Sequence, residues 1–188
     1  GVGNFRNVIV DNCIISRSNR GLSIQIRDGG NVENVSYSNC IIETRRFCPD
    51  WWGTAEPIVI TCFNRDENTK AGKVKNIRFR NISCKGENGV LIHSTKENMI
   101  ENVSFENVWV TMSKTSKWDC GLYDLRPCLD YGVEKIKNSG FFIRNAENVL
   151  IEKSGVEWGN VCDEYNKAID AENAPGFEII RFTGKDAH

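Results

Sequence analysis

The stretch at residues 102–110, NVSFENVWV, alternates apolar and polar residues and carries asparagine at its first and sixth positions. Such alternation predicts a β-strand with one buried face. The same frame recurs at 7–13, 34–40 and 76–82, with degenerate copies at 148–154 and 176–182. Three of the five intervals between frame starts are 26 to 28 residues long, and the other two are longer. Self-similarity at this period indicates a repeat architecture.

A second short apolar stretch follows most frames. These stretches lie at 21–26, 56–61, 89–94, 140–145 and 167–173. Two or three short strands per repeat, joined by tight turns, are typical of a parallel β-helix, and no helical period is present. We therefore predict an all-β parallel β-helix (a solenoid) of about six coils, with two long loop insertions, as a single domain over residues 1–188.

The asparagines have a predicted role in this arrangement. Asn tolerates left-handed backbone and suits a sharp turn between strands. We expect the sixth-position residues to stack about 4.8 Å apart as a side-chain ladder that satisfies buried polar groups. These residues are Asn12, Asn39, Asn81 and Asn107. The alternative is that they are unrelated turn residues.

Composition excludes several classes of function. The net charge is −1, which gives no basic surface for nucleic acid, and the apolar runs are too short to span a membrane. Eight cysteines occur without a CxxC, and there are two histidines, so we predict no metal site and no cofactor. Cys13, Cys40 and Cys84 fall at inward positions and are interpreted as small hydrophobic residues. A Cys120–Cys128 pair stays open.

Outward positions on the second strands form a predicted polar stripe. Ser23 and Gln25 alternate with apolar residues, and aligned repeats place Thr61, His93 and Arg144 in the same column as Gln25. The stripe is either one side of a binding groove or simply solvated.

Two insertions carry most of the remaining candidates. The first, at 43–57, holds adjacent Trp51 and Trp52 with Glu56 nearby, a combination that suits a sugar ring, although either indole could instead cover the core. The second, at 113–140, holds Arg126, which suits a uronate carboxylate or a structural bridge to Asp124.

RGLSIQIRDGGNVENVSYSNCIIE (20–43), WWGTAEPIVI (51–60) and ENGVLIHS (87–94) make the chain similar to the C-terminal half of family 28 glycoside hydrolases, the polygalacturonase family. The resemblance implies a right-handed parallel β-helix that hydrolyses α-linked pectic sugars with inversion. Inversion requires an acid and a base carboxyl roughly 6.5 to 9.5 Å apart.

Two departures from the family pattern shape the expectation. The Asn-Thr-Asp, Gly-x-Asp-Asp and Gly-His-Gly motifs do not occur, so we expect these residues to be the C-terminal portion of a longer catalytic domain and to be inactive alone. The family's Arg-Ile-Lys is written here as Ser23-Ile24-Gln25, which puts uronate specificity in doubt. The predicted substrate contacts are Ser23, Gln25, Arg27, Trp51, Trp52, Glu56, His93, Arg126 and Arg144.

Other readings stay open. The chain could be a non-catalytic carbohydrate-binding or adhesin-like module, or a structural assembly protein. A pectic or related polysaccharide is the expected partner, and self-association or missing N-terminal coils would cover the open end. The resemblance suggests a secreted or periplasmic location, whereas free core cysteines fit the cytoplasm.

Overall fold

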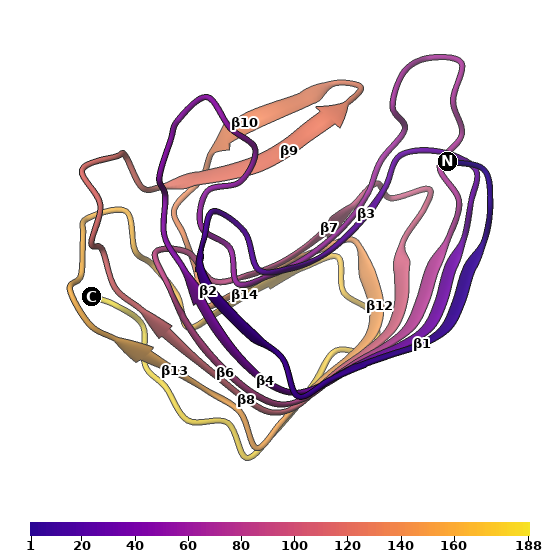
Figure 1. Ribbon diagram of the computed structural model, residues 1–188. Coiled ribbons are helices and arrows are strands. Elements are labelled where there is room, and N and C mark those ends of the chain that lie inside the picture. Colours follow the sequence, from indigo (N-terminus) through magenta and orange to yellow (C-terminus); the bar gives the residue numbers. More distant parts are fainter.

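The computed structural model describes residues 1–188 and contains strands but no helix. It therefore has no helix that is long and apolar enough to cross a membrane. The strands form two parallel sheets that face each other across the core, with a two-stranded ribbon outside them (Figure 1). The all-β class predicted from the sequence is confirmed.

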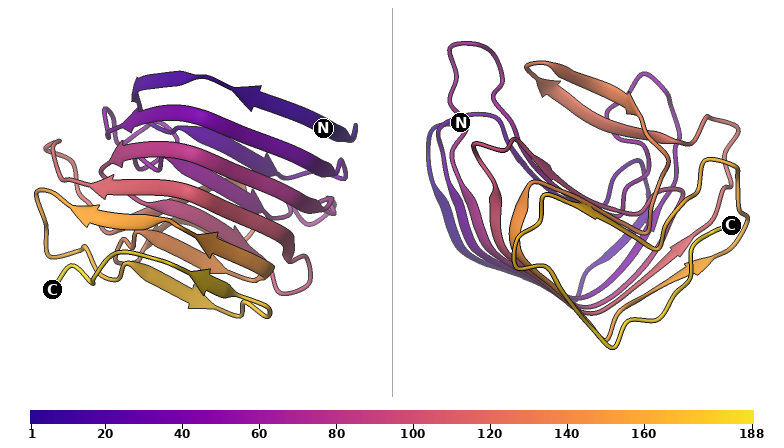
Figure 2. Two further views of the ribbon diagram at one scale, coloured as in Figure 1. Left: turned by 90° about the horizontal axis from the view of Figure 1, so that it is seen from below. Right: turned by 180° about the vertical axis from the view of Figure 1, so that it is seen from behind.

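Sheet A has eight strands and sheet B has five. Sheet A consists of β1 (Phe5–Asp11), β2 (Ile14–Ser18), β4 (Val32–Thr44), β6 (Val74–Gly86), β8 (Ile100–Met112), β12 (Ala146–Glu152), β13 (Gly155–Trp158) and β15 (Glu178–Ile180). Sheet B consists of β3 (Leu22–Ile26), β5 (Ile58–Cys62), β7 (Val90–Ser94), β11 (Phe141–Arg144) and β14 (Ile169–Glu172). Successive repeats lie side by side in both sheets, and the two termini lie at opposite ends of the stack (Figure 2).

The sixth-position asparagines bend strands without ending them. Asn39, Asn81 and Asn107 have φ between 53° and 54° inside continuous strands of sheet A. Asn81 Nδ2 donates to Asn39 Oδ1 at 3.1 Å, and Asn107 Nδ2 donates to Asn81 Oδ1 at 3.0 Å. The predicted ladder is confirmed for these three, but it is exposed and does not satisfy buried groups. At its end, Asn39 donates to Asp11 Oδ1 at 2.9 Å, so Asn12 is not a rung.

The first-position asparagines form a second ladder that the sequence did not predict. Each side-chain amide donates to the corresponding amide of the preceding repeat, at 2.9 to 3.2 Å. The members are Asn7, Asn34, Asn76, Asn102 and Asn148, and all have positive φ. Two rows of identical amides therefore run along the outside of sheet A.

The core lies between the two sheets, where the predicted inward stacks are found. Cys40 pairs in register with Ile82, and Cys84 pairs with Ile42. All four side chains are buried, and burial raises the pKa of the Cys84 thiol. Cysteine therefore acts here as a small hydrophobic residue, as predicted.

The predicted solenoid of about six coils with two long loop insertions requires correction. Sheet A has six strands along its main path, but sheet B has five, and the second insertion is not a loop. Its residues form an antiparallel ribbon of β9 (Leu122–Cys128) and β10 (Tyr131–Lys135). The reason is that Leu122, Tyr123 and Asp124 pair with the returning β10 backbone.

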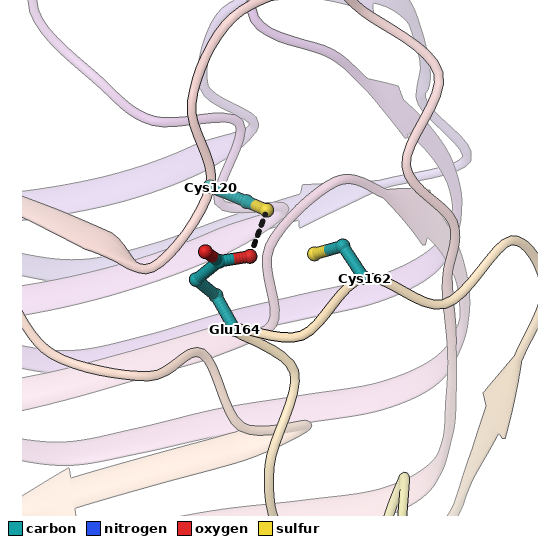
Figure 3. Close-up of side chains that lie close together, drawn as sticks. All are labelled: Cys120, Cys162 and Glu164. Atoms are coloured by element: carbon teal, nitrogen blue, oxygen red, sulfur yellow. Dashed lines mark hydrogen bonds between the residues drawn. The ribbon is translucent and has the colours of Figure 1, made fainter.

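The second insertion also gives Cys120 an unexpected neighbour. Cys120 lies beside Cys162 and Glu164, which follow β13, and not beside Cys128 (Figure 3). The Cys128 thiol instead donates to Leu125 O at 2.9 Å.

Candidate functional site

The outward column predicted on sheet B is present in register. Gln25 pairs with Thr61, Thr61 with His93, and His93 with Arg144 along the parallel strands β3, β5, β7 and β11. Ser23 begins a neighbouring column on the same face. Strand alternation therefore correctly predicted which side chains of sheet B point away from the core.

Most of this face is covered by the ribbon. A small apolar cluster fills the space between sheet B and β9, and Thr61 is fully buried beside it. The cluster consists of Val59, Phe63, Leu91, Tyr123, Leu125 and Phe142. The predicted groove along the whole column is therefore wrong, because an insertion seals its middle.

His93 lies at the margin of this sealed region. Its ring is 5.1 Å from that of Phe63, 5.9 Å from that of Tyr131 and 6.0 Å from that of Phe142, as centroid distances. Burial, together with the charge of Arg144, lowers the pKa of His93 to about 4. The imidazole is thus neutral at physiological pH and packs among aromatic rings while part of its surface stays exposed, so its sugar contact stays a prediction.

Arg27 is also a correction. Its guanidinium is buried and donates to Pro127 O at 2.7 Å and to Leu125 O at 2.9 Å, both on the ribbon. A third bond reaches Thr61 Oγ1 at 3.0 Å. Buried donors that are fully used by the protein do not face a ligand, so Arg27 fastens the ribbon to sheet B.

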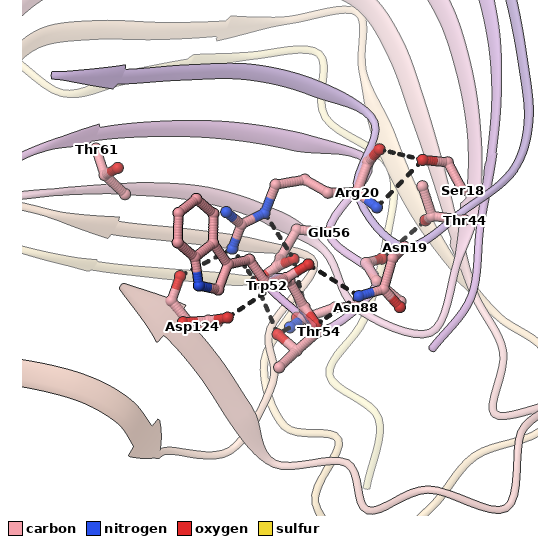
Figure 4. Close-up of polar contacts among 12 residues, drawn as sticks. Ser18, Asn19, Arg20, Thr44, Trp52, Thr54, Glu56, Thr61, Asn88 and Asp124 are labelled. Atoms are coloured by element: carbon pink, nitrogen blue, oxygen red, sulfur yellow. Dashed lines mark hydrogen bonds and ion pairs between the residues drawn. The ribbon is translucent and has the colours of Figure 1, made fainter. Parts of the chain in front are cut away.

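Glu56 has a structural role as well. Its carboxylate is fully buried and accepts bonds from Thr54 N at 2.8 Å and from Arg20 Nε at 3.3 Å. Arg20 in turn donates to Asp124 O at 2.8 Å (Figure 4). The prediction of Glu56 as a sugar contact is therefore wrong, because this network leaves it no access to solvent.

Arg126 forms the bridge to Asp124 that was one of its two predicted roles. Nε and Nη2 donate to the two carboxylate oxygens of Asp124, each at 2.9 Å. Burial opposes ionisation of Asp124, but bonds from Arg126 and from Gly53 N outweigh it and lower its pKa. The Arg126 side chain keeps one third of its surface exposed, so it can still present an edge to a ligand.

Arg144 is occupied by its own neighbours. It donates to Asp170 Oδ2 at 2.9 Å, lies 3.3 Å from Glu172 Oε2, and its guanidinium carbon is 4.0 Å from the centroid of the Phe142 ring. These contacts occupy most of its donors, and 18% of its side chain stays exposed, so its sugar contact stays a prediction.

Both tryptophans of the first insertion face solvent. Trp51 is 72% exposed and Trp52 is 51% exposed, so neither serves as the predicted lid on the core. The loop that carries them is nevertheless fixed, because Asn19 Nδ2 donates to Trp52 O at 2.9 Å and Gly53 N donates to Asp124 Oδ2 at 2.7 Å. Two adjacent exposed indoles on an anchored loop require a functional explanation.

β3 carries two more of the predicted contacts, Ser23 and Gln25. Ser23 is exposed, and Gln25 Nε2 is buried without a hydrogen-bond partner. β3 is the terminal strand of sheet B, and the apolar cluster beneath the ribbon takes no side chain from it. Ser23, the two indoles and Arg126 are therefore the predicted contacts that keep exposed surface.

A hollow lined by three lysines, together with Glu97 and Asp130, lies at the other ends of the sheet B strands. Its volume is about 680 Å³, and Lys70, Lys73 and Lys96 line it together with Tyr131. Sequence reasoning missed it because its lysines come from two loops with no shared motif: Lys70 and Lys73 precede β6, and Lys96 follows β7.

Comparisons with family models, with curated proteins and with solved structures give no match for this chain. The function is therefore argued from the geometry of the site.

Proposed function

We propose that this chain provides substrate-binding surface for a polygalacturonase-type glycoside hydrolase that cleaves pectic polysaccharide with inversion. The observation that carries the proposal is the pair of exposed indoles, Trp51 and Trp52, on a loop fixed by Asn19 and Asp124. A sugar ring has an apolar face that covers an indole and hydroxyl edges that need polar partners. Ser23 and Arg126 supply such partners.

The chemistry of hydrolysis is assigned to residues outside this sequence. Inverting cleavage needs two accessible carboxyl groups on either side of the scissile bond. Asp50 in the tryptophan loop is exposed, but its neighbours Glu56 and Asp124 are fully buried and held by Arg20 and Arg126, so neither can serve as the second carboxyl group. They support the binding surface, and the chain's own task is to hold the sugar.

The charge of the preferred sugar follows from the same residues. The guanidinium of Arg126 is already paired with the Asp124 carboxylate, and Ser23 and Gln25 are uncharged. We therefore expect a neutral pectic sugar at the tryptophan loop. A uronate carboxylate would instead find lysines in the hollow lined by Lys70 and Lys96.

Binding by the 188-residue chain tests the proposal. Titration with galactan, rhamnogalacturonan and polygalacturonate, followed by calorimetry, is expected to show binding of at least one of them. Trp51→Ala and Trp52→Ala should each weaken it about tenfold or more, as expected for a ring at the centre of a contact. Trp109→Ala is the matched control, because this partly exposed indole lies on sheet A and bonds Asn107 Oδ1 at 3.0 Å.

Unchanged affinity in the Trp51→Ala/Trp52→Ala double variant would overturn the binding surface, as would no binding to any of the three polysaccharides. Release of reducing ends by the chain alone would overturn the assignment of catalysis to residues outside it.

A further inference from the structure

A separate polar cluster lies where the loop before β9 meets the loop after β13 (Figure 3). The ligand atoms of Cys120, Cys162 and Glu164 all lie within 4.8 Å of one another. Cys120 Sγ is 3.3 Å from Glu164 Oε2. None of these residues belongs to the tryptophan loop or to β3, so the proposed sugar surface does not account for the cluster.

We propose that Cys120, Cys162 and Glu164 bind a soft divalent cation such as Zn²⁺. Thiolate sulfur with carboxylate oxygen is a ligand set that zinc accepts in tetrahedral geometry. In such a tetrahedron a sulfur and an oxygen ligand lie about 3.5 Å apart, and two sulfurs lie about 3.8 Å apart. The observed 3.3 Å separation of Cys120 Sγ and Glu164 Oε2 fits the first edge, and the 4.8 Å limit includes the second.

The backbone holds the two loops together independently of any cation. Asn138 joins them, since its Oδ1 accepts from Gly121 N at 2.7 Å and its N–H donates to Glu164 O at 2.8 Å. Gly121 has φ +74°, and a Cβ there would lie 2.7 Å from Glu164 Cγ. Tyr165 N donates to Cys162 O at 3.0 Å, which closes a turn between Cys162 and buried Tyr165. The ligands therefore come from a preorganised frame.

The surroundings suit the charge of the loaded site. Two thiolates and one carboxylate around a divalent cation carry a net charge of −1. Lys114, Lys117, Lys135 and Lys137 line the hollow that also contains Cys120 and Glu164, and their positive charge complements that anion.

Cobalt titration of the full chain, purified in reductant, tests the site. We expect one Co²⁺ per chain, with a thiolate-to-cobalt absorption band that Zn²⁺ abolishes by displacement. Cys162→Ser should weaken cobalt binding about 100-fold or more, and Glu164→Gln about tenfold or more. Cys48→Ser is the matched control, because Cys48 also lies near a carboxylate, with Sγ 3.8 Å from Asp50 Oδ2, but has no second thiol.

Three results would overturn the proposal. The first is no thiolate-to-cobalt band in the reduced chain. The second is a band of equal strength and affinity in Cys162→Ser and Glu164→Gln; Glu164→Gln keeps both sulfurs and so remains informative if Cys162→Ser does not fold. The third is a chain purified without reductant or chelator that carries a Cys120–Cys162 disulfide and no metal by elemental analysis.

Discussion

Two packed regions of this molecule are built in different ways. The core between sheets A and B takes equivalent side chains from successive repeats, as in the stacked rings of Tyr37, Phe79 and Phe105, whose centroids are 5.2 and 5.0 Å apart. The smaller cluster beneath the ribbon joins sheet B residues to one insertion, through Tyr123 and Leu125. The first region is periodic and the second is not.

This difference predicts different stability. Every repeat contributes side chains to the large core, so disruption of this core is expected to unfold the whole chain. The ribbon is held by one small cluster and by hydrogen bonds from Arg27, Arg20 and the tryptophan loop, so it is expected to open while the sheets persist.

The largest expected effect is in the shared core. Phe105 is fully buried, stacks on Phe79 and meets Phe141 of sheet B at 5.4 Å between centroids. Phe105→Ala should lower the free energy of unfolding by about 3–5 kcal/mol in urea denaturation. Ile41→Ala is the control, because Ile41 is exposed on sheet A and its loss should cost about 0.5 kcal/mol. Similar losses for both variants would contradict a core continuous between the sheets.

The second test uses the acid response of the ribbon cluster. The pKa of His93 is about 4 in the folded chain and 6.5 ordinarily, so folding favours the neutral ring. Its stabilising contribution is complete above pH 6.5, falls as the pH drops, and is lost below about pH 4. The loss amounts to up to about 3 kcal/mol.

Carboxyl groups also titrate in this range, so the quantity to follow is the difference in unfolding free energy between the wild type and His93→Leu. The unfolding free energy of the wild type should approach that of His93→Leu, or fall below it, as the pH goes from 7 to 4. A constant difference would mean that the ribbon does not seal His93 from water.

The smallest effect is expected at the amide ladder. Asn81 has φ +53° and an exposed side chain, so Asn81→Ala should cost about 1–2 kcal/mol, mostly as backbone strain. Asn81→Gly keeps the backbone conformation accessible and should cost about 1 kcal/mol or less. If thermal denaturation shows equal losses of stability for Asn81→Ala and Asn81→Gly, the amide hydrogen bonds, and not the backbone conformation, explain why asparagine occupies this position.

The parts of the fold that repeat were predictable from the sequence. The alternation around Asn81 and Asn107 gave the inward stacks, and the second strands of sheet B lie close to where they were predicted. Asn12 failed as a rung because Asp11 accepts the bond from Asn39 in its place. Periodic reasoning works where every repeat places a residue in the same environment.

The parts that depend on insertions were not predictable. Nothing in the alternation around Arg27 or His93 indicates that a later ribbon covers them, although Arg27 bonds Pro127, 100 residues further along the chain. Cys120 and Cys162 come from two loops 42 residues apart, so no spacing motif relates them. The exposed indoles were identified from composition and context, whereas their solvent exposure needed coordinates.

The two asparagine ladders do not by themselves fix which repeats pair during folding. A frame that paired with the wrong neighbour, skipping one repeat, would still find an asparagine at each rung and would keep its side-chain bonds. Discrimination must come from features that differ between repeats, such as the three-ring column that ends at Phe105. Substitutions that make the repeats more alike should therefore favour misaligned, kinetically trapped states, even where they leave the native contacts intact.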